Sequence, residues 1–406
     1  MNKKPKVVFS NFKNNWKIFS FYNLANIFLS GGTPSTKEPT FWGGTIPWIQ
    51  SSDIQKDILF GVIPQKFISE EGLQKSSAKL IPKNSIAIVT RVGVGKLAII
   101  DQDYATSQDF LSLSDINGDT QFIVYSIYRM LQKESTQLQG TSIKGITKED
   151  ILSKKISLPE IEEQSAIGSL FRTLDDLLAR YKENLANYQS LKTTMLSKMF
   201  PKAGQTVPEI RLDGFEGEWK KSKLKDVAHR VQGNDGRMDL PTLTISASGG
   251  WMNQIDRFSA NIAGKEQKNY TLLKKGELSY NHGNSKLAKY GVVFELQEYE
   301  EALVPKVYHS FRVNQLADAK FIEIMFSTKI PDRELGKLVS SGARMDGLLN
   351  ISFEDFMNIA IIIPTIEEQQ AIGTYFSNLD NLITAHQEKI SQLEILKKKL
   401  LQDMFI

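Results

Sequence analysis

Residues 159–168 read PEIEEQSAIG, and residues 364–373 repeat them as PTIEEQQAIG. The two stretches lie 364 − 159 = 205 positions apart, and the likeness runs without a gap to Met199-Phe200 and Met404-Phe405, so that 18 of the 42 aligned positions are identical. Self-similarity at a fixed long period marks a duplicated structural unit. A chain built from two copies of one unit should have pseudo-two-fold symmetry, which suits a two-sided partner such as a DNA duplex.

The likeness also extends upstream of the repeated stretch, so the duplication takes in the whole chain. Pro5, Phe9, Phe12 and Trp16 are matched 203 positions later by Pro208, Leu212, Phe215 and Trp219. Each half therefore consists of a globular part and a long helix, and a segment rich in proline and glycine joins the halves. We expect a first globular domain at residues 1–157, a first helical region at 158–200, a linker at 201–218, a second globular domain at 219–362 and a second helical region at 363–406.

Both helical regions carry apolar residues at steps of three or four positions. One series runs from Ile167 to Met199, and the other occupies the same frame from Ile372 to Met404. A seam with nearly a 3.5-residue period is typical of coiled coils. About 38 residues at 1.5 Å each make a helix of about 57 Å, which needs a partner along its length. We expect the two copies to pack antiparallel, with a globular domain at each end of the rod.

The globular domains are expected to be mixed α/β. Short β-branched runs at residues 85–90 and 291–294 predict strands, and Gly-Gly pairs at 31–32, 43–44 and 249–250 predict turns. The two domains share little sequence in their middles, which indicates one fold whose surface has diverged. The predicted fold class is therefore α+β: two α/β globular domains separated by two long antiparallel coiled-coil helices, with an internal pseudo-two-fold repeat.

The bulk composition restricts the chemistry of the chain. Of 406 residues, 41% are hydrophobic and 24% are charged, and the formal net charge is +4. These are ordinary values for a soluble globular protein, and they permit nucleic-acid binding without requiring it. The lack of cysteine excludes disulfides, thiolate metal sites and cysteine nucleophiles. No apolar run approaches the ~20 residues of a membrane span, and the N-terminus does not read as a signal peptide, so we expect a cytoplasmic protein.

The sequence carries only weak catalytic patterns. Gly93-Val94-Gly95-Lys96 is similar to a phosphate-binding loop, but Thr90 and Leu97 stand where that motif needs a glycine and a Ser or Thr, so a β-turn is the better interpretation. The four histidines lack zinc-helix spacing, and no Gly-x-Ser-x-Gly elbow or amino-methyltransferase box is present. Acid–base chemistry by Glu162-Glu163 or Glu367-Glu368 is an alternative, but carboxylates at a helix start favour the positive end of its dipole.

Loops of both globular domains combine glycine, aromatic and hydrogen-bonding residues. Arg, Asn and Gln read base edges, and Lys holds phosphates. The predicted DNA-binding residues of the first domain are Lys37, Gln50, Ser51, Ser52, Arg91, Lys96, Ser107 and Gln108. Those of the second domain are Asn234, Arg237, Trp251, Tyr280, Asn281, His282, Lys286, Lys289 and Arg344. The alternative for any one of them is local packing, which we expect for Trp42 and Trp48.

The duplicated Pro-x-Ile-Glu-Glu-Gln-x-Ala-Ile-Gly motif resembles the conserved regions of the specificity subunits of type I restriction–modification enzymes. Residues 30–35, SGGTPS, followed by residues 42–49, WGGTIPWI, resemble the start of a target recognition domain, and residues 105–110, ATSQDF, fit the same pattern. Residues 207–212, VPEIRL, are similar to the start of a second such domain. Residues 273–281, LKKGELSYN, resemble a different class of recognition domain, which lacks the Gly-Thr-Pro-Ser motif.

This resemblance implies a non-catalytic subunit that reads DNA. Each globular domain would read a few base pairs in one half of a bipartite site on double-stranded DNA, and two unlike domains imply an asymmetric site. The paired helices would fix the unread gap between the half-sites. Two modification subunits, which bind S-adenosylmethionine and methylate adenine, would dock on the helical regions. Two restriction subunits, which use ATP and magnesium, would complete the complex, and the chain itself would hold no cofactor or metal and contact no membrane.

Two alternatives come from other classes of protein. The first is a structural protein, an intramolecular coiled coil that presents two protein-binding heads and has no role on DNA. The second is an enzyme with its own methyltransferase or nuclease activity, which the missing motifs disfavour. DNA binding with a steep inverse dependence on salt would separate a specificity subunit from the structural protein.

Overall fold

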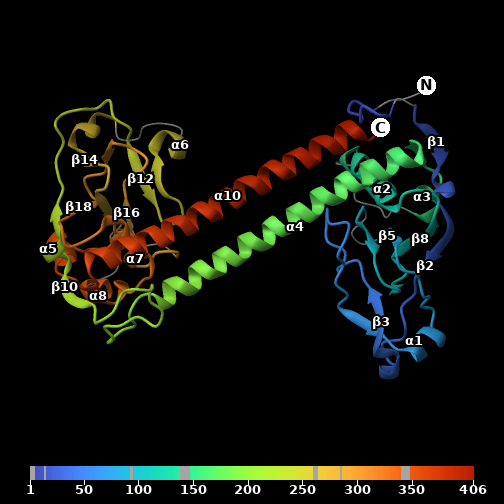
Figure 1. Cartoon of the computed structure of the whole chain (residues 1–406), viewed down its shortest axis with the longest axis horizontal. Helices are drawn as coiled ribbons and strands as arrows, with labels where there is room; N and C mark the ends of the chain where they lie inside the picture. The colour runs from blue at the N-terminus through green and yellow to red at the C-terminus, as the bar shows by residue number, and fades with distance from the viewer. Residues whose placement is uncertain are drawn as a thin grey trace. The chain divides into compact units, whose positions relative to one another are not determined.

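The computed structural model divides the chain into two compact units, and each unit takes segments from both halves of the sequence (Figure 1). Unit 1 contains residues 1–183 and 388–406, and unit 2 contains residues 184–387. The structure describes residues 5–12, 15–91, 95–137, 147–258, 264–283, 286–339 and 348–406. Each unit therefore holds one globular domain, the beginning of one long helix and the end of the other.

In the residues that the structure describes, the globular part of unit 1 holds three small sheets. The largest has the order β2 (Ala25–Ser30), β8 (Phe110–Ile116), β5 (Ser85–Val89) and β6 (Leu97–Ile100), all antiparallel. The second joins β4 (Lys66–Ile68), β3 (Trp42–Ile49) and β7 (Ala105–Thr106), and β3 runs parallel to β7. The third pairs β1 (Lys17–Ser20) with β9 (Lys155–Leu158).

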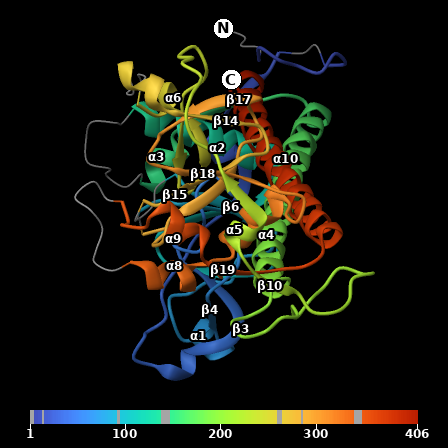
Figure 2. The same ribbon diagram turned by 90° about the vertical axis from the view of Figure 1, so that its left-hand side faces the viewer.

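The helices of unit 1 are α1 (Glu70–Gln74), α2 (Thr120–Gln137), α3 (Lys148–Leu152), the first part of α4 (Ile161–Lys198) and the last part of α10 (Ile366–Met404), with short 3-10 helices at Phe21–Leu24 and Pro39–Phe41. α1 lies beside β3 in both views (Figures 1 and 2). All five residues of β5, SIAIV, are buried, so the strand predicted at residues 85–90 forms the centre of the core sheet.

Unit 2 repeats this plan with different loops. Its four-stranded sheet has the order β11 (Ala228–Arg230), β18 (His309–Val313), β15 (Leu278–Asn281) and β16 (Val292–Glu295). Three antiparallel pairs accompany it: β10 (Lys220–Lys223) with β19 (Ala360–Ile363), β12 (Leu243–Ser246) with β13 (Gly250–Asn253), and β14 (Thr271–Lys274) with β17 (Glu301–Val304). The short helices are α5 (Leu224–Val227), α6 (Gln254–Phe258), α7 (Ala319–Ser327), α8 (Asp332–Leu338), α9 (Phe353–Met357) and a 3-10 helix at Gly264–Asn269.

The two units share strand register as well as strand order. Lys17 pairs with Leu158 in unit 1, and Lys220 pairs with Ile363 in unit 2, at the same offsets of 203 and 205 that relate the sequences. The order β2-β8-β5-β6 is matched by β11-β18-β15-β16. The duplicated fold is therefore present in both units, although the middles of the two domains differ in sequence.

The glutamine of the repeated motif ties each long helix to its globular domain. Gln164 accepts a hydrogen bond from the Asp119 backbone N–H at 3.1 Å, and Gln369 accepts one from Asp318 at 3.0 Å. Each glutamine also donates to the carbonyl of the proline five residues earlier, at 3.0 Å. Asp119 and Asp318 in turn accept from the N–H groups of Phe122 and Phe321, at the starts of α2 and α7. The motif thus fixes the position of a second helix in each unit.

The second glutamate of each motif lies in the core. Glu163 is 2% exposed and accepts a hydrogen bond from the Trp16 indole at 3.4 Å. Glu368 is 1% exposed, accepts from Trp219 at 3.3 Å, and receives two further bonds from Arg211 at 2.8 and 2.6 Å. These contacts give both carboxylates a packing role.

Each unit is completed by the last residues of the helix that starts in the other unit. In unit 1, the Phe405 ring stacks on Phe122 at 5.3 Å between centroids. In unit 2, the Phe200 ring stacks on Phe321 at 5.5 Å. The tryptophans Trp16 and Trp219 pack edge-on against the same two pairs. This cluster of one tryptophan and two phenylalanine rings is therefore duplicated together with the motif.

Ion pairs connect the two long helices inside each unit. In unit 1 Asp175 pairs with Lys397, and Lys182 pairs with Glu394 at 2.7 Å. In unit 2 Lys192 pairs with Asp380, and the Tyr188 and His386 rings lie 5.1 Å apart. Residue numbers rise along α4 as they fall along α10, so the helix segments run antiparallel within each unit. At the offset of 205, Asp175 of α4 matches Asp380 of α10, and Lys192 of α4 matches Lys397 of α10. The ion pair of unit 1 therefore recurs in unit 2 with the roles of the two helices exchanged.

Candidate nucleic-acid interface

Polar residues of unit 1 gather where the parallel strands β3 and β7 end. Residues 50–52 follow β3, and residues 107–108 follow β7. The Ser107 backbone N–H donates to the Ile49 carbonyl at 3.1 Å, which holds the two strand ends together. The structure thus brings together five of the eight residues predicted for the first domain.

Three cations surround this edge. Lys96 donates to the Ser51 carbonyl at 3.2 Å, and Arg91 lies 3.9 Å from Asp109 with 65% of its side chain exposed. Lys66, which the sequence did not reveal, donates to the Gln50 side chain at 3.5 Å. We call the following residues the loop cluster: Gln50, Ser51, Ser52, Lys66, Arg91, Lys96 and Gln108. Lys37 is exposed on the preceding loop.

Two glycines, Gly31 and Gly32, allow the loop at residues 30–35 to pass close to the backbone of residues 106–107 and of Ser77. A Cβ on Gly31 would lie 2.1 Å from Thr106 Oγ1, and a Cβ on Gly32 would lie 2.2 Å from the Ser77 carbonyl oxygen. Thr33 can then donate to the Gln108 side chain at 2.7 Å. Trp48 is 4% exposed and donates its indole N–H to Gly32, so it packs in the core as expected.

The second domain presents a different arrangement, a cavity of about 450 Å³ lined by both polar and apolar residues, which we call the polar cavity after its polar members. Asn281 and Lys286 line it, together with Ser246, Ser248 and Arg257, three residues that the sequence analysis did not select. The cavity lies between the β12–β13 turn, the end of α6, the end of β15 and the segment before β16. Two of the predicted residues therefore meet here.

Tyr280 and His282 lie in the core of the second domain. Tyr280 is fully buried on β15, its ring stacks on Phe356 at 4.4 Å, and burial raises its pKa. His282 is 3% exposed, and its two ring nitrogens lie 2.7 and 2.9 Å from backbone carbonyl oxygens. His309 stacks on it at 4.7 Å, and burial lowers the pKa of His309 to about 4. Both side chains therefore pack within the domain, and their predicted contact with DNA stays a prediction.

Four further predicted residues of the second domain have partners within it. Asn234 donates to the Arg237 carbonyl at 2.9 Å, and the Arg237 guanidinium pairs with Asp235 at 2.8 Å and Glu301 at 2.7 Å. Hydrogen bonds from Arg237 lower the pKa of both carboxyl groups. The two carboxylates compensate the charge of Arg237, which weakens it as a phosphate contact.

Trp251 and Lys289 complete the set. The Trp251 indole donates to the Glu295 carbonyl at 3.0 Å, and the Lys289 ammonium lies 5.2 Å from the centre of the Tyr290 ring. Arg344 lies outside the described residues, and so do Gly93 and Val94 of the phosphate-loop-like stretch.

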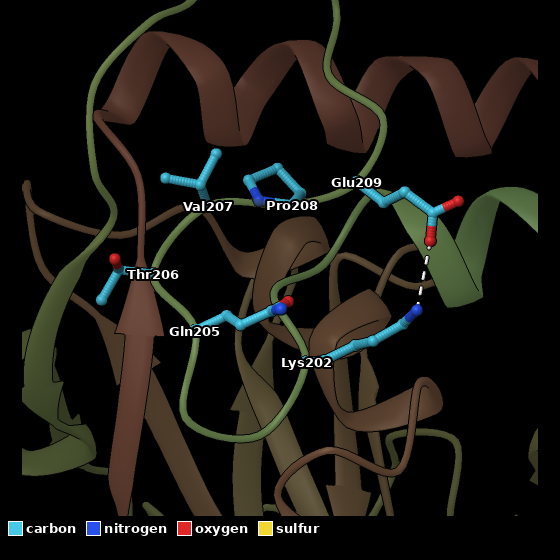
Figure 3. A pocket seen from close by; sticks show the side chains of 6 residues that line it. All are labelled: Lys202, Gln205, Thr206, Val207, Pro208 and Glu209. Atoms are coloured by element: carbon cyan, nitrogen blue, oxygen red, sulfur yellow. Dashed lines mark hydrogen bonds and ion pairs between the residues drawn. The ribbon is translucent and has the colours of Figure 1, made fainter.

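A second cavity, of about 470 Å³, lies in the linker and is lined by residues 202 and 205–209. Figure 3 shows Lys202 reaching towards Glu209, with which it pairs at 3.1 Å. The charge of Lys202 is thus compensated, whereas Lys66 and Lys96 of the loop cluster form no ion pair among the described residues.

Among the described residues, no group of three or more His, Cys, Asp or Glu side chains is placed to hold a metal ion. In those parts of the chain, no helix combines the length and apolar character that crossing a membrane requires.

One protein family matches the chain twice. Its profile, described as "Type I restriction modification DNA specificity domain", aligns with residues 13–187 and again with residues 216–395. The chain belongs to this family. The first match contains the loop cluster, and the second contains the polar cavity, so each family copy carries one of the two polar sites.

Two curated relatives are specificity subunits of type I restriction enzymes. The MjaIX specificity subunit of Methanocaldococcus jannaschii is 26% identical over 175 residues, which are 41% of this chain and 40% of the relative. The EcoR124I/EcoR124II specificity subunit of Escherichia coli is 32% identical over 166 residues, which are 38% of this chain and 40% of the relative. The aligned part therefore spans well under half the length of each relative.

A solved structure shares the fold of this family member. The crystal structure of the type I restriction–modification system S subunit from M. genitalium covers 100% of this chain, and the chain covers 99% of it. The TM-score is 0.60 at 14% sequence identity, so the likeness shows a common fold.

Lys66 and Arg257 were not predicted from the sequence, because contacts between segments far apart in the chain place them at the two sites. Lys66 reaches Gln50 because β4 pairs antiparallel with β3, with Lys66 opposite Trp48. Arg257 joins Lys286 because α6 and the segment before β16 border one cavity. The small-residue turn at 246–250, SASGG, was the one local signal of this site.

Proposed function

We propose that this chain is the DNA-specificity subunit of a type I restriction–modification system and reads a bipartite, asymmetric site on double-stranded DNA. The observation that carries the proposal is the double match to the specificity-domain family, one match for each globular domain. The loop cluster and the polar cavity offer different donors and acceptors, which supports two unlike half-sites.

The proposed organisation assigns one role to each segment. Residues 1–157 and 219–362 act as the two target recognition domains, residues 158–200 and 363–406 act as the conserved helical regions, and residues 201–218 link the halves. α4 has 38 residues and α10 has 39. At 1.5 Å per residue each is about 57 Å long. The ion pairs repeated at an offset of 205 support an antiparallel coiled coil, which would set the unread gap between the half-sites.

The chemistry is assigned to partner subunits. Two modification subunits that bind S-adenosylmethionine and methylate adenine would dock on the helical regions, and two restriction subunits that use ATP and magnesium would complete the complex. The chain itself is proposed to be non-catalytic, since Glu163 and Glu368 are bound to tryptophans in the core. Its place would be the cytoplasm, where the DNA is.

The proposed contact residues follow from exposure and charge. In the first domain they are Lys37, Gln50, Ser51, Ser52, Lys66, Arg91, Lys96 and Gln108. In the second domain they are Ser246, Ser248, Arg257, Lys286 and Lys289. Ser107 is left out because it is 6% exposed and supports the strand ends.

Binding to DNA tests the proposal. The purified chain, in complex with its modification subunit, is incubated with genomic DNA fragments over a range of salt concentrations. We expect the logarithm of the association constant to fall steeply and linearly with the logarithm of salt, because Lys and Arg displace counterions from phosphates. Binding that is absent or insensitive to salt would contradict a role on DNA and favour two protein-binding heads.

A further inference from the structure

The polar cavity of the second domain has the chemistry of an anion site. Its lining contributes the Arg257 guanidinium, the Lys286 ammonium, the Ser246 and Ser248 hydroxyls and the Asn281 carboxamide. None of the residues that line it is an Asp or a Glu. The lining therefore holds two positive charges and several donors with no acidic group to balance them.

The two cations are not compensated elsewhere in the described ranges. Over those residues, neither Arg257 nor Lys286 forms an ion pair. Other cations of the domain do: Arg237 pairs with Asp235 and Glu301, and Lys275 pairs with Glu300. Two uncompensated cations that face one cavity repel each other, and an anion between them would relieve that repulsion.

The local bonds leave donors available to a ligand. One nitrogen of Arg257 contacts the Ile245 carbonyl at 3.5 Å, and the guanidinium lies 5.0 Å from the centre of the Phe258 ring. These contacts orient the guanidinium and leave its other N–H groups without a partner among the described residues. Both polar groups of the Asn281 side chain have partners: its NH2 group donates to the Ile245 carbonyl at 3.2 Å, and its carbonyl oxygen accepts from the Gly283 N–H at 3.1 Å. Asn281 therefore shapes the wall, and the cations and hydroxyls are the groups that can bind.

The volume of the cavity indicates how large an anion it can hold. About 450 Å³ is at the lower end of the range for small-molecule sites and exceeds what one phosphate needs. We propose that this cavity binds a phosphodiester of the DNA backbone together with its sugar, with Arg257 and Lys286 on the phosphate oxygens. The Ser246 and Ser248 hydroxyls lie 3.3 Å apart and bond each other, so one of them is left as a further donor. This inference rests on the proposed DNA-binding function and assigns a site within it that positions the strand without reading a base.

The test uses the intact chain with its modification subunit. The variants Arg257→Gln and Lys286→Gln each remove one charge and keep a polar side chain. Each should make the slope of log association constant against log salt less steep, and the double variant should lower it by about 0.9, the contribution of one phosphate. Lys275→Gln is the matched control, because Lys275 is an exposed lysine of the same domain that pairs with Glu300, and its slope should equal that of the wild type. Lys286→Arg, which keeps the charge, should also keep the slope.

Three results would overturn the inference. The first is a glutamine variant with the wild-type slope. The second is a changed methylated sequence in either glutamine variant, since that would make the cavity a base reader. The third is saturable binding of a free deoxynucleoside monophosphate that Lys286→Gln abolishes while the DNA slope stays unchanged, which would make the ligand a free nucleotide. A wild-type chain with no salt dependence would instead refute the DNA-binding function itself, so the two failures are distinguishable.

A neutral-linkage scan locates the contact on the DNA. In a duplex that carries the bound site, single phosphates are replaced by uncharged methylphosphonates. One linkage should weaken wild-type binding and have a smaller effect on Lys286→Gln, in which only Arg257 still meets that phosphate. Equal losses in both proteins at every linkage would contradict the proposal.

Discussion

At the residue scale, the two copies of the motif glutamate differ in one partner. Glu368 receives two hydrogen bonds from Arg211, whereas the position that matches Arg211 in the first half, 211 − 203 = 8, is the exposed Val8. Burial raises the pKa of Glu163 above its ordinary 4.5, because a charge without a cation is unfavourable in the core. Identical motif residues thus have different energetic roles.

The same substitution should therefore have different costs at the two positions. Glu368→Gln leaves the Arg211 charge without its partner, and removing one member of a buried ion pair costs about 3 kcal/mol. Glu163→Gln removes a carboxylate that has no such partner, so we expect a cost below about 1 kcal/mol at neutral pH. Urea unfolding followed by tryptophan fluorescence measures both. Equal losses would show that Arg211 does not stabilise the motif.

The pKa of Glu163 also predicts a dependence on pH. A carboxyl whose folded pKa is raised adds stability below about pH 4.5, in its protonated form, and this contribution is lost as pH rises through the folded pKa. The free energy of unfolding of the wild type should therefore fall relative to that of Glu163→Gln as pH rises from about 4 to about 7. A difference that stays constant over this range would refute the assignment.

Residue types suggested a DNA-binding surface, but the direction of each side chain could not be predicted. The sequence around Tyr280-Asn281-His282 is polar and aromatic and resembles a loop. In the structure Tyr280 lies on β15, between β18 and β16, and its neighbours cover it. Burial of this kind depends on pairing with strands far away in the sequence, which no local pattern reports.

At the element scale, the long helices were the most predictable feature because their signal is local. The apolar seam predicted helices within 158–200 and 363–406, and the structure has them at Ile161–Lys198 and Ile366–Met404. The ion pairs between them were not predictable, since they depend on how the helices align. Asp175 and Lys397 are 19% and 12% exposed, and Asp175 also accepts from the Tyr125 hydroxyl at 2.6 Å.

Burial decides which of these pairs stabilises unit 1. Lys397→Met should lower the free energy of unfolding by about 2–3 kcal/mol, because it leaves Asp175 without its cation in a partly buried network. Lys182→Met removes an exposed pair with Glu394 and should change it by less than about 0.5 kcal/mol. Chemical denaturation of both variants provides the comparison. A larger loss for Lys182→Met would contradict the alignment of the helices.

At the scale of the whole molecule, the duplication predicted both the repeated fold and the double family match, but it did not predict how the chain would divide. Each compact unit takes the start of one long helix and the end of the other, and it is closed by Phe405 or Phe200. The two recognition domains are therefore proposed to depend on the same pair of helices, which act as the spacer.

The spacer role predicts the effect of a deletion. Removing one heptad from both helices shortens each by about 10 Å, which is about three base pairs of B-DNA. The methylated site should keep both half-sequences and lose about three base pairs of the gap between them. Mapping methylated adenines in cells that carry the deleted form checks this, and an unchanged gap would refute the ruler.

The most direct test of two independent recognition domains is an exchange of one of them. Residues 16–157 are replaced by the corresponding domain of another specificity subunit, the hybrid is expressed with its modification subunit, and methylated adenines are mapped across the host genome. We predict that one half of the methylated sequence changes while the other half and the gap stay the same. A change in both halves, or in neither, would contradict the account.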